Sequence, residues 1–176
     1  AAMQHEAAQK VYYAFTRGDA TRLQHHIEVR ALKDDTGVLR KASTEFHYVG
    51  GCEDSPERSS LVIARPTTGR WHQIRKHLNG LNHPVLNDAK HGDSKVNRWW
   101  RRERGLRHLG LHCAALRLPL PDGQELHVEC PVRRDLITIW QQLPWWDQAQ
   151  SALPLLKCED PWDVQSIEAL DALIMH

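Results

Sequence analysis

Residues 66–78 read PTTGRWHQIRKHL and closely follow an apolar run, LVIA, at residues 61–64. The pattern predicts a strand over 60–65, a tight Thr-Thr-Gly turn and a helix over 71–81. A helix start offers free backbone N–H groups and the positive end of the dipole, and cationic side chains crowd this one. The segment is therefore predicted to meet an anion, either a phosphate or a buried carboxylate, although a solvated basic helix face would show the same composition.

One arginine of this helix is predicted to be partly buried. Ile74 and Leu78 are spaced i, i+4, which places one face of the helix in the core. Arg75 falls close to that face on an ideal helix. A guanidinium group in that position needs an anionic partner, because burying an unpaired charge is costly.

Positive charge is concentrated in one part of the chain. Between residues 70 and 107 there are ten Lys and Arg residues against three Asp and Glu residues, a net charge of +7, whereas the whole chain carries only +1. Such a segment favours a polyanionic partner. Residues 151–176 are acidic instead, and we expect them to be exposed to solvent or to contact a partner.

Length and composition fit one domain, predicted over residues 1–150, followed by an acidic tail over 151–176 with a possible helix at 164–174. The hydrophobic fraction of 41% is enough for a core, and no stretch is apolar enough to predict a membrane helix. The 4 cysteines stand far apart without a C-x-x-C pair, which argues against a disulfide framework and a zinc ribbon. We expect a reducing intracellular compartment, cytoplasmic or organellar, and no metal site.

The predicted strands and helices do not alternate in a βαβ series. This order favours an α+β fold with a mixed, mostly antiparallel sheet and flanking helices. We predict strands at 10–15, 26–32, 42–48, 60–65, 109–118 and 125–129, helices at 71–81, 94–104 and 133–143, the end of a helix at 1–9, and a loop at 50–56. Ser94 is a possible helix cap. Trp140, Trp145 and Trp146 are assigned to the core, whereas Trp99 and Trp100 are compatible with stacking on bases or with packing.

Several blocks of sequence resemble one family, the RNA pseudouridine synthases that modify uridines of ribosomal RNA and tRNA as stand-alone enzymes. The block Thr68–Leu78 is similar to the third signature motif of that family, and it is followed by His83-Pro84-Val85 and Asp88. Lys10–Ala14 resembles the family's Lys-x-Tyr-x-Ala segment. The resemblance spans residues 4 to 147. The blocks most similar to the tRNA pseudouridine synthase C subgroup are Lys90-His91-Gly92-Asp93, Asn97-Arg98 and Leu111-His112-Cys113-Ala114.

The resemblance implies a role for several residues. Tyr12 matches the active-site tyrosine that stacks beside the target uracil and is a candidate base. Arg75 matches the residue that pairs with the catalytic aspartate, and Leu78 matches an apolar contact of the uracil pocket. The implied RNA-binding residues are Arg70, His72, Gln73, Lys76, Lys90, His91 and Arg98. Asn87 stands where the family usually has glycine, and asparagine tolerates the left-handed backbone of such a turn.

The resemblance also implies the catalytic-domain fold of the family, a basic cleft, RNA as partner (tRNA, with ribosomal RNA as the alternative), a monomer, no membrane contact, and no metal or organic cofactor. One part of the family pattern is missing. The catalytic aspartate lies in a His-Arg-Leu-Asp motif upstream of the tyrosine, and no such motif occurs in the chain. Arg134-Asp135-Leu136 is only superficially similar, because an acid there suits a helix start.

Three interpretations follow from the missing aspartate. The first is the C-terminal portion of a synthase catalytic domain, which lacks the N-terminal part and is inactive by itself. The second is an RNA-binding pseudoenzyme that retains the basic cleft without the chemistry. The third is a basic domain whose Arg and His clusters are only a solvated surface.

Overall fold

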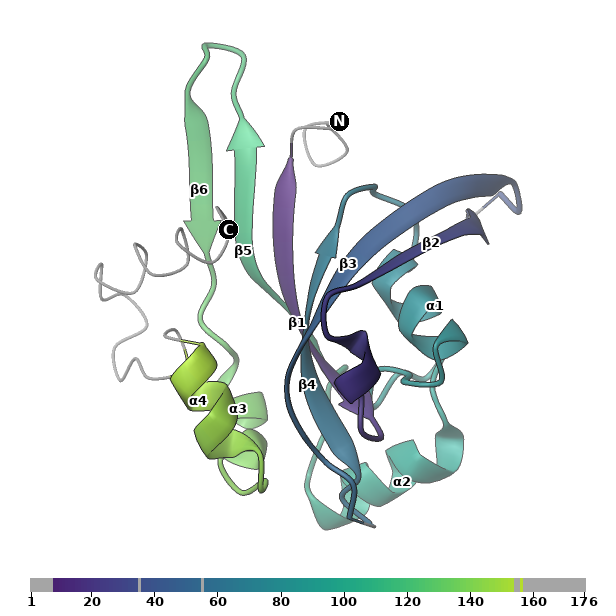
Figure 1. Ribbon diagram of the computed structural model, residues 1–176, viewed down its shortest axis with the longest axis vertical. Helices are drawn as coiled ribbons and strands as arrows, with labels where there is room; N and C mark the ends of the chain where they lie inside the picture. The colour runs from purple at the N-terminus through teal and green to yellow at the C-terminus, as the bar shows by residue number, and fades with distance from the viewer. Residues whose placement is uncertain (1–7, 35, 55, 154–155, 157–176) are drawn as a thin grey trace.

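One twisted sheet runs through the protein in this computed structural model, which describes residues 8–34, 36–54, 56–153 and 156. The strand order of this 6-stranded sheet is β2-β3-β4-β1-β5-β6, and the strands at its two ends run in clearly different directions (Figure 1). The elements are β1 (Gln9–Arg17), the 3-10 helix η2 (Thr21–Leu23), β2 (His26–Lys33), β3 (Leu39–Cys52), β4 (Ser59–Pro66), α1 (Gln73–Gly80), α2 (Ser94–Glu103), β5 (Leu111–Pro119), β6 (Glu125–Glu129), α3 (Arg134–Trp140) and α4 (Trp146–Ala152).

The α+β class and the flanking helices are confirmed, but the sheet is not mixed within the described residues. All of its strand pairings are antiparallel. Short turns or loops join β2 to β3, β3 to β4 and β5 to β6, which suits antiparallel pairing. The six predicted strands and the helices predicted at 71–81, 94–104 and 133–143 are present, with shifted ends.

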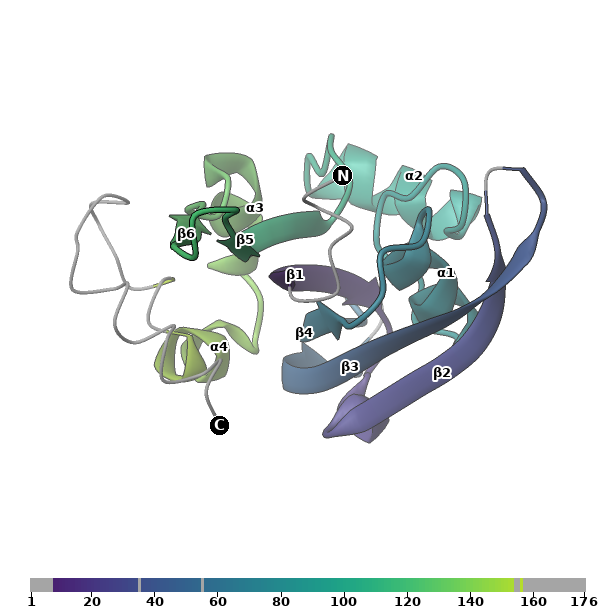
Figure 2. The same ribbon diagram turned by 90° about the horizontal axis from the view of Figure 1, so that it is seen from above.

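Strand β1 lies inside the sheet, and its side chains alternate between two apolar cores. Val11, Tyr13 and Phe15 face the larger cluster, whereas Ala14 faces the smaller one together with Ile74 and Leu78 of α1. Helix α1 therefore covers one face of the sheet, and α3 and α4 lie on the other side (Figures 1 and 2). The helix predicted from the segment 66–78 is thus held against the sheet by the apolar pair that predicted its buried face.

An aromatic cluster fills the larger core. Phe15 is fully buried and makes edge contacts with three indoles, at centroid distances of 5.0 Å to Trp100, 6.0 Å to Trp140 and 5.9 Å to Trp145. The assignment of Trp140, Trp145 and Trp146 to the core is confirmed. Trp100 is a core residue as well, so the packing interpretation holds for it, and Trp99 is partly buried against it.

Three element ends differ from the sequence prediction for local reasons. Helix α1 begins at Gln73 and not at Trp71, because His72 has a left-handed backbone with φ 53°. Asp93 caps α2 in place of Ser94, since its carboxylate accepts from Lys95 N and Val96 N. Strand β3 continues through residues 50–52, which were predicted as a loop; the glycines there allow a register shift beside Trp145.

The ends of the chain are described only in part. Gln9 opens β1, so the predicted helix end over 1–9 is wrong at that residue, and residues 1–7 lie outside the described part. Helix α4 crosses the expected boundary at residue 150, and Leu153 and Leu156 pack into the larger core. The division into 1–150 and 151–176 stays a prediction, and the expected helix at 164–174 lies outside the described residues.

A buried imidazole on α1 makes the fold sensitive to acid. His77 is fully buried, its Nδ1 lies 3.0 Å from Thr44 Oγ1, and its Nε2 has no partner among the described residues. Burial, with a smaller effect of Arg30, lowers the pKa of His77 to about 4, and Glu28 opposes this only weakly. The folded protein therefore keeps His77 neutral well below the pKa of about 6.5 that an unfolded histidine has.

We predict that His77 contributes stability above pH 6.5 that is lost as the pH falls from 6.5 to 4, because only the unfolded chain takes up the proton in that window. The full effect is about 3 kcal/mol. His77→Gln should remove that part of the pH dependence of the free energy of unfolding, measured by urea titration between pH 4 and 8. His127→Gln, at an exposed position on β6, is the matched control. An unchanged pH dependence in His77→Gln would contradict the assignment.

Candidate functional site

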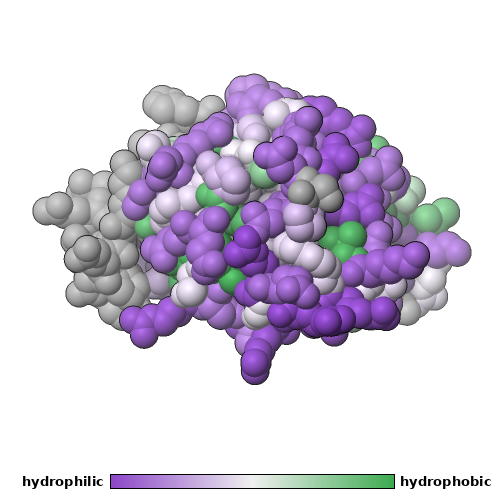
Figure 3. Space-filling model, turned by 90° about the horizontal axis from the view of Figure 1, so that it is seen from below, coloured by the Kyte–Doolittle hydropathy of each residue, from purple (hydrophilic) through white to green (hydrophobic). Residues whose placement is uncertain are grey.

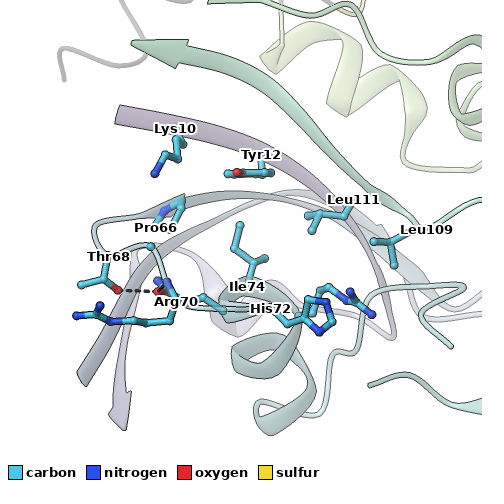
Figure 4. Close-up of a pocket in the computed structure, with 12 residues that line it drawn as sticks. Lys10, Tyr12, Pro66, Thr68, Arg70, His72, Ile74, Leu109 and Leu111 are labelled. Atoms are coloured by element: carbon cyan, nitrogen blue, oxygen red, sulfur yellow. Dashed lines mark hydrogen bonds between the residues drawn. The ribbon is translucent and has the colours of Figure 1, made fainter. Parts of the chain in front are cut away.

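A cavity of about 300 Å³ opens between β1, the turn after β4 and the start of β5. Its walls come from separate elements: Lys10 and Tyr12 lie on one side, Arg70 and His72 on the other, and Ile74, Leu109 and Leu111 supply apolar surface (Figure 4). The other lining residues are Pro66, Thr68, Gly69, Gln73 and Arg75. A volume at the small end of the range for ligand sites suits one planar ring better than a larger ligand.

Arg75 and Asp88 form a buried ion pair beside this cavity. Arg75 Nε and Nη2 donate to the two carboxylate oxygens of Asp88, each at 2.6 Å. The Asp88 side chain is 1% exposed and that of Arg75 is 17% exposed. The prediction that Arg75 is partly buried and paired with an anion is confirmed, and its partner is the aspartate ten residues after the end of the helical segment quoted at the outset.

The Asp88 carboxylate is ionised in this setting. Burial by itself would raise its pKa, but the Arg75 guanidinium and the backbone amides of His91 and Lys90 outweigh burial and lower the pKa to about 2. Both amides donate to the same oxygen at 2.9 Å. The carboxylate is thus held by four donors.

Helix α2 holds the loop that carries Asp88. Asn97 accepts from Asn87 N at 2.7 Å and donates to the carbonyl oxygen of Asp88 at 2.9 Å. Asn87 has φ 57°, which is the left-handed conformation predicted for it. A side chain at Gly92 would place its Cβ 2.5 Å from the Asp88 carbonyl oxygen, so only glycine fits there. The ion pair therefore joins α1, the loop 87–92 and α2.

Arg75 retains a donor nitrogen that no described residue uses. Its Nη1 makes no hydrogen bond with any described residue, while Nε and Nη2 are both committed to Asp88. Because Arg75 also lines the cavity, the guanidinium group can hold Asp88 and still offer Nη1 to a second anion.

Two of the predicted site residues, Gln73 and Leu78, mainly contact other residues of the fold. Gln73 is 4% exposed; its side-chain oxygen accepts from Thr68 Oγ1 at 2.6 Å and Arg70 N at 3.0 Å, and its side-chain nitrogen donates to Ser43 O at 2.8 Å. Gln73 therefore shapes the turn that presents Arg70. Leu78 is fully buried in the smaller core and does not line the cavity; Ile74, one turn earlier, supplies the apolar wall instead.

Tyr12 is partly buried and its ring borders the cavity. It sits on β1 opposite Cys113 of β5. Burial, together with the neighbouring Cys113, raises the pKa of Tyr12 to about 12. At neutral pH the side chain is a protonated phenol, which can stack on a ring and donate a hydrogen bond.

The remaining predicted basic residues separate into two groups. His72 and His91 lie 3.0 Å apart between Nδ1 and Nε2, and Lys76 and Lys90 both reach the indole of Trp71. These four residues and Arg70 border the cavity or its rim, whereas Arg98 lies on the exposed side of α2. The end of the molecule that carries α2 is mostly hydrophilic (Figure 3). Lys10 and Trp71 were not among the predicted site residues. The signal available in the sequence for Trp71 was an aromatic residue within a run of cationic residues.

Comparison with known proteins agrees with this geometry. The sequence profile described as RNA pseudouridylate synthase matches residues 1–80. The tRNA pseudouridine synthase C of Vibrio vulnificus is 40% identical over 86 residues, which are 49% of this chain and 34% of that protein. That of Vibrio parahaemolyticus is 38% identical over 116 residues, which are 66% of this chain and 46% of that protein. The match places residues 1–80 of the chain in the RNA pseudouridylate synthase family.

A solved structure whose title names a pseudouridylate synthase domain has a similar fold. The structure of Human RNA Pseudouridylate Synthase Domain Containing 1 covers 87% of this chain with a TM-score of 0.61 at 22% identity, and the match covers 67% of the human chain. The chain spans between a third and a half of the length of the two curated synthases above. Among the described residues, no helix combines the length and apolar character that crossing a bilayer requires.

We predict that Arg75→Met destabilises the fold by about 3–5 kcal/mol, because it leaves the Asp88 carboxylate buried without its partner. The free energy of unfolding, measured by urea titration, checks this. The double variant Arg75→Met/Asp88→Leu should recover a large part of the loss, since it removes the unpaired charge. A loss below about 1 kcal/mol in Arg75→Met would contradict the buried pair as the support of this site.

Proposed function

We propose that the chain is the RNA-binding and uridine-holding portion of a tRNA pseudouridine synthase, an isomerase that converts uridine to pseudouridine. The observation that carries the proposal is the cavity itself, in which Tyr12 and Arg75 face a common space of about 300 Å³. Both residues match family positions, and the family match of residues 1–80 supports the assignment of the chemistry.

The cavity suits a base that has left its stack. An enzyme that works on a base within folded RNA extrudes the nucleotide, at a cost of a few kcal/mol. The apolar surface of Ile74 and Leu111 and the ring of Tyr12 would receive the uracil, and the cationic side chains at the rim would hold the phosphates on either side. The net charge of +7 over residues 70–107 would attract a polyanion to this part of the chain.

The isomerisation needs a carboxylate at the glycosidic bond, so that the base can detach, turn and rejoin through carbon. Asp88 is unsuited to that task, because it is 1% exposed, accepts four hydrogen bonds and is tied to Arg75. We propose that the catalytic aspartate comes from outside these residues and pairs with the free Nη1 of Arg75. That pairing would keep the aspartate ionised in a desolvated pocket.

Tyr12 would act in its neutral form when uracil enters. A phenol whose pKa is raised to about 12 stacks on the base and can donate a hydrogen bond to it, and it becomes a strong base only after losing its own proton. The partner would be tRNA, with ribosomal RNA as the alternative, bound by a monomer in the cytoplasm. The second candidate is an RNA-binding pseudoenzyme, which the missing His-Arg-Leu-Asp motif favours.

The proposal predicts that the chain binds a tRNA transcript more tightly than a duplex RNA of equal length, because only the tRNA offers unpaired uridines. Tyr12→Ala should weaken tRNA binding by roughly 5-fold to 150-fold, the value of one lost stacking contact, and leave duplex binding unchanged. Tyr12→Phe is the matched control, since it keeps the ring. Fluorescence anisotropy at several salt concentrations measures both affinities. Equal affinities for the two RNAs, unaffected by Tyr12→Ala, would overturn the proposal.

Tritium release from tRNA labelled at uridine C5 separates the two candidates. The chain alone should release no tritium, because it supplies no catalytic aspartate. Release restored when a His-Arg-Leu-Asp segment of a family member is fused before Ala1 supports the synthase, and binding without release in that fusion supports the pseudoenzyme. Release by the unfused chain would show that the catalytic carboxylate is already present.

A further inference from the structure

A second cavity, of about 550 Å³, opens at the end of β1, whereas the first cavity is lined by Lys10 and Tyr12 near the start of that strand. Its volume lies within the range of ligand sites. Three arginines line it, each from a different segment: Arg17 ends β1, Arg22 belongs to η2, and Arg58 precedes β4. Guanidinium groups gathered around one cavity favour an anionic ligand.

A buried imidazole holds one of these guanidinium groups in place. His83 is 7% exposed, and its Nδ1 lies 3.1 Å from the carbonyl oxygen of Arg17. A carbonyl oxygen only accepts, so Nδ1 carries the proton and Nε2 is an acceptor, to which Arg22 Nε donates at 3.1 Å. Burial lowers the pKa of His83, which keeps the ring neutral at neutral pH.

The contacts of Arg22 orient its guanidinium group without neutralising it. Besides the neutral His83 ring, the carbonyl oxygen of Leu81 accepts from Arg22 Nη2. Both acceptors are uncharged, so neither cancels the positive charge of Arg22. The side chain is thus fixed at the cavity wall before any ligand arrives, which lowers the entropy cost of binding.

Two carboxylates belong in the charge balance of this cavity. Asp19 is one of the lining residues, and Asp93, the cap of α2, accepts from Arg17 Nη1 at 2.9 Å. Three arginines against these two acids leave one positive charge among the lining residues and their described ion-pair partners. A backbone phosphodiester carries one negative charge, whereas a terminal phosphate group carries about 1.5 to 2 at pH 7. The balance therefore suits a phosphate within a strand.

We propose that Arg17, Arg22 and Arg58 bind one backbone phosphodiester of RNA at this second cavity. The site rests on the proposed function, since it takes RNA as the ligand, and it extends the contact with RNA beyond the uridine cavity. Tyr12 and Arg17 are both on β1, so with a strand rise of ~3.3 Å per residue the two sites are roughly 16 Å apart. The phosphate would then belong to a nucleotide several positions from the uridine, because a stacked strand rises about 3.4 Å per nucleotide.

The test measures tRNA affinity over a range of salt concentrations for the wild type, Arg58→Gln and the control Arg134→Gln. Both arginines are exposed, and Arg134 belongs to α3 and does not line the cavity. Arg58→Gln should weaken binding and lower the slope of log K against log salt by about 0.7 to 0.9, the value of one phosphate contact. Arg134→Gln removes the same charge and should leave the slope unchanged. Equal slopes for the two variants would overturn the site.

The double variant Tyr12→Ala/Arg58→Gln tests whether the two cavities bind RNA separately. The fold-losses of tRNA affinity should multiply to within about 2-fold, because changes at well-separated positions are independent. A double variant that departs further from this product would place the Arg58 phosphate at the uridine cavity and overturn a separate site.

Duplex RNA of equal length distinguishes this site from the proposed function. An unchanged slope in Arg58→Gln, with a tRNA-specific loss in Tyr12→Ala, overturns the site and leaves the proposed function standing. A lowered slope in Arg58→Gln for tRNA and duplex alike, with no effect of Tyr12→Ala on either, overturns the proposed function and supports the phosphate site.

A titration with inorganic phosphate separates a strand phosphate from a free anion. The free ion should bind much more weakly than tRNA, since it brings only one contact and carries more charge than the cavity balances. If inorganic phosphate bound tightly, and Arg58→Gln abolished that binding without changing tRNA affinity, the cavity would be a site for a small anion and the RNA assignment would be wrong.

Discussion

Arg75 and Asp88 form a buried ion pair that joins three separate parts of the chain. The guanidinium belongs to α1, the carboxylate to the loop before α2, and Asn97 of α2 holds that loop from the other side. Two charges in so dry a place are stable only when their hydrogen bonds are complete, and Asp88 meets that condition with four donors. This contact fixes Arg75 in the cavity wall and holds the loop 87–92 against α1.

The same ion pair decides which charged groups near the cavity are already paired within the fold. Asp88 is paired with Arg75, whereas Lys76 and Lys90 place their ammonium groups over the Trp71 indole. Arg75 keeps one nitrogen for a second anion at the cavity. The chain thus combines cationic side chains with a small pocket that has apolar walls. Under the proposed function the cationic side chains would hold phosphates and the pocket would hold a base.

The sequence predicted the strands and helices well where the apolar pattern was strong, and less well where single side chains decide the backbone. Ile74 and Leu78 marked the buried face of α1, and the motif block identified the family. The start of α1 could not be predicted, because it depends on the left-handed His72 and on the hydrogen bonds of Gln73 with a distant strand. The strand at residues 50–52 was missed because its glycines are typical of a loop, whereas in the structure Trp145 packs against Gly50.

Site prediction had a similar limit. Sequence identified Arg75 as a residue that needs an anion, yet it could not show that Asp88 fills this need, because the pairing depends on how the loop folds back. Leu78 was predicted to contact the uracil pocket, but it is buried in the smaller core and does not line the cavity. The contacts of Lys76 and Lys90 with Trp71 could not be predicted either, since residues 76 and 90 are not neighbours in the chain.

The most direct measurement of this account is the pKa of the Asp88 carboxyl group, read from its carbon-13 chemical shift in an NMR titration. The ion pair predicts a carboxylate that keeps its ionised shift down to pH 3.5, with a pKa of about 2. A midpoint near the ordinary aspartate value of about 4, or above it, would contradict the buried pair and with it the support of the site.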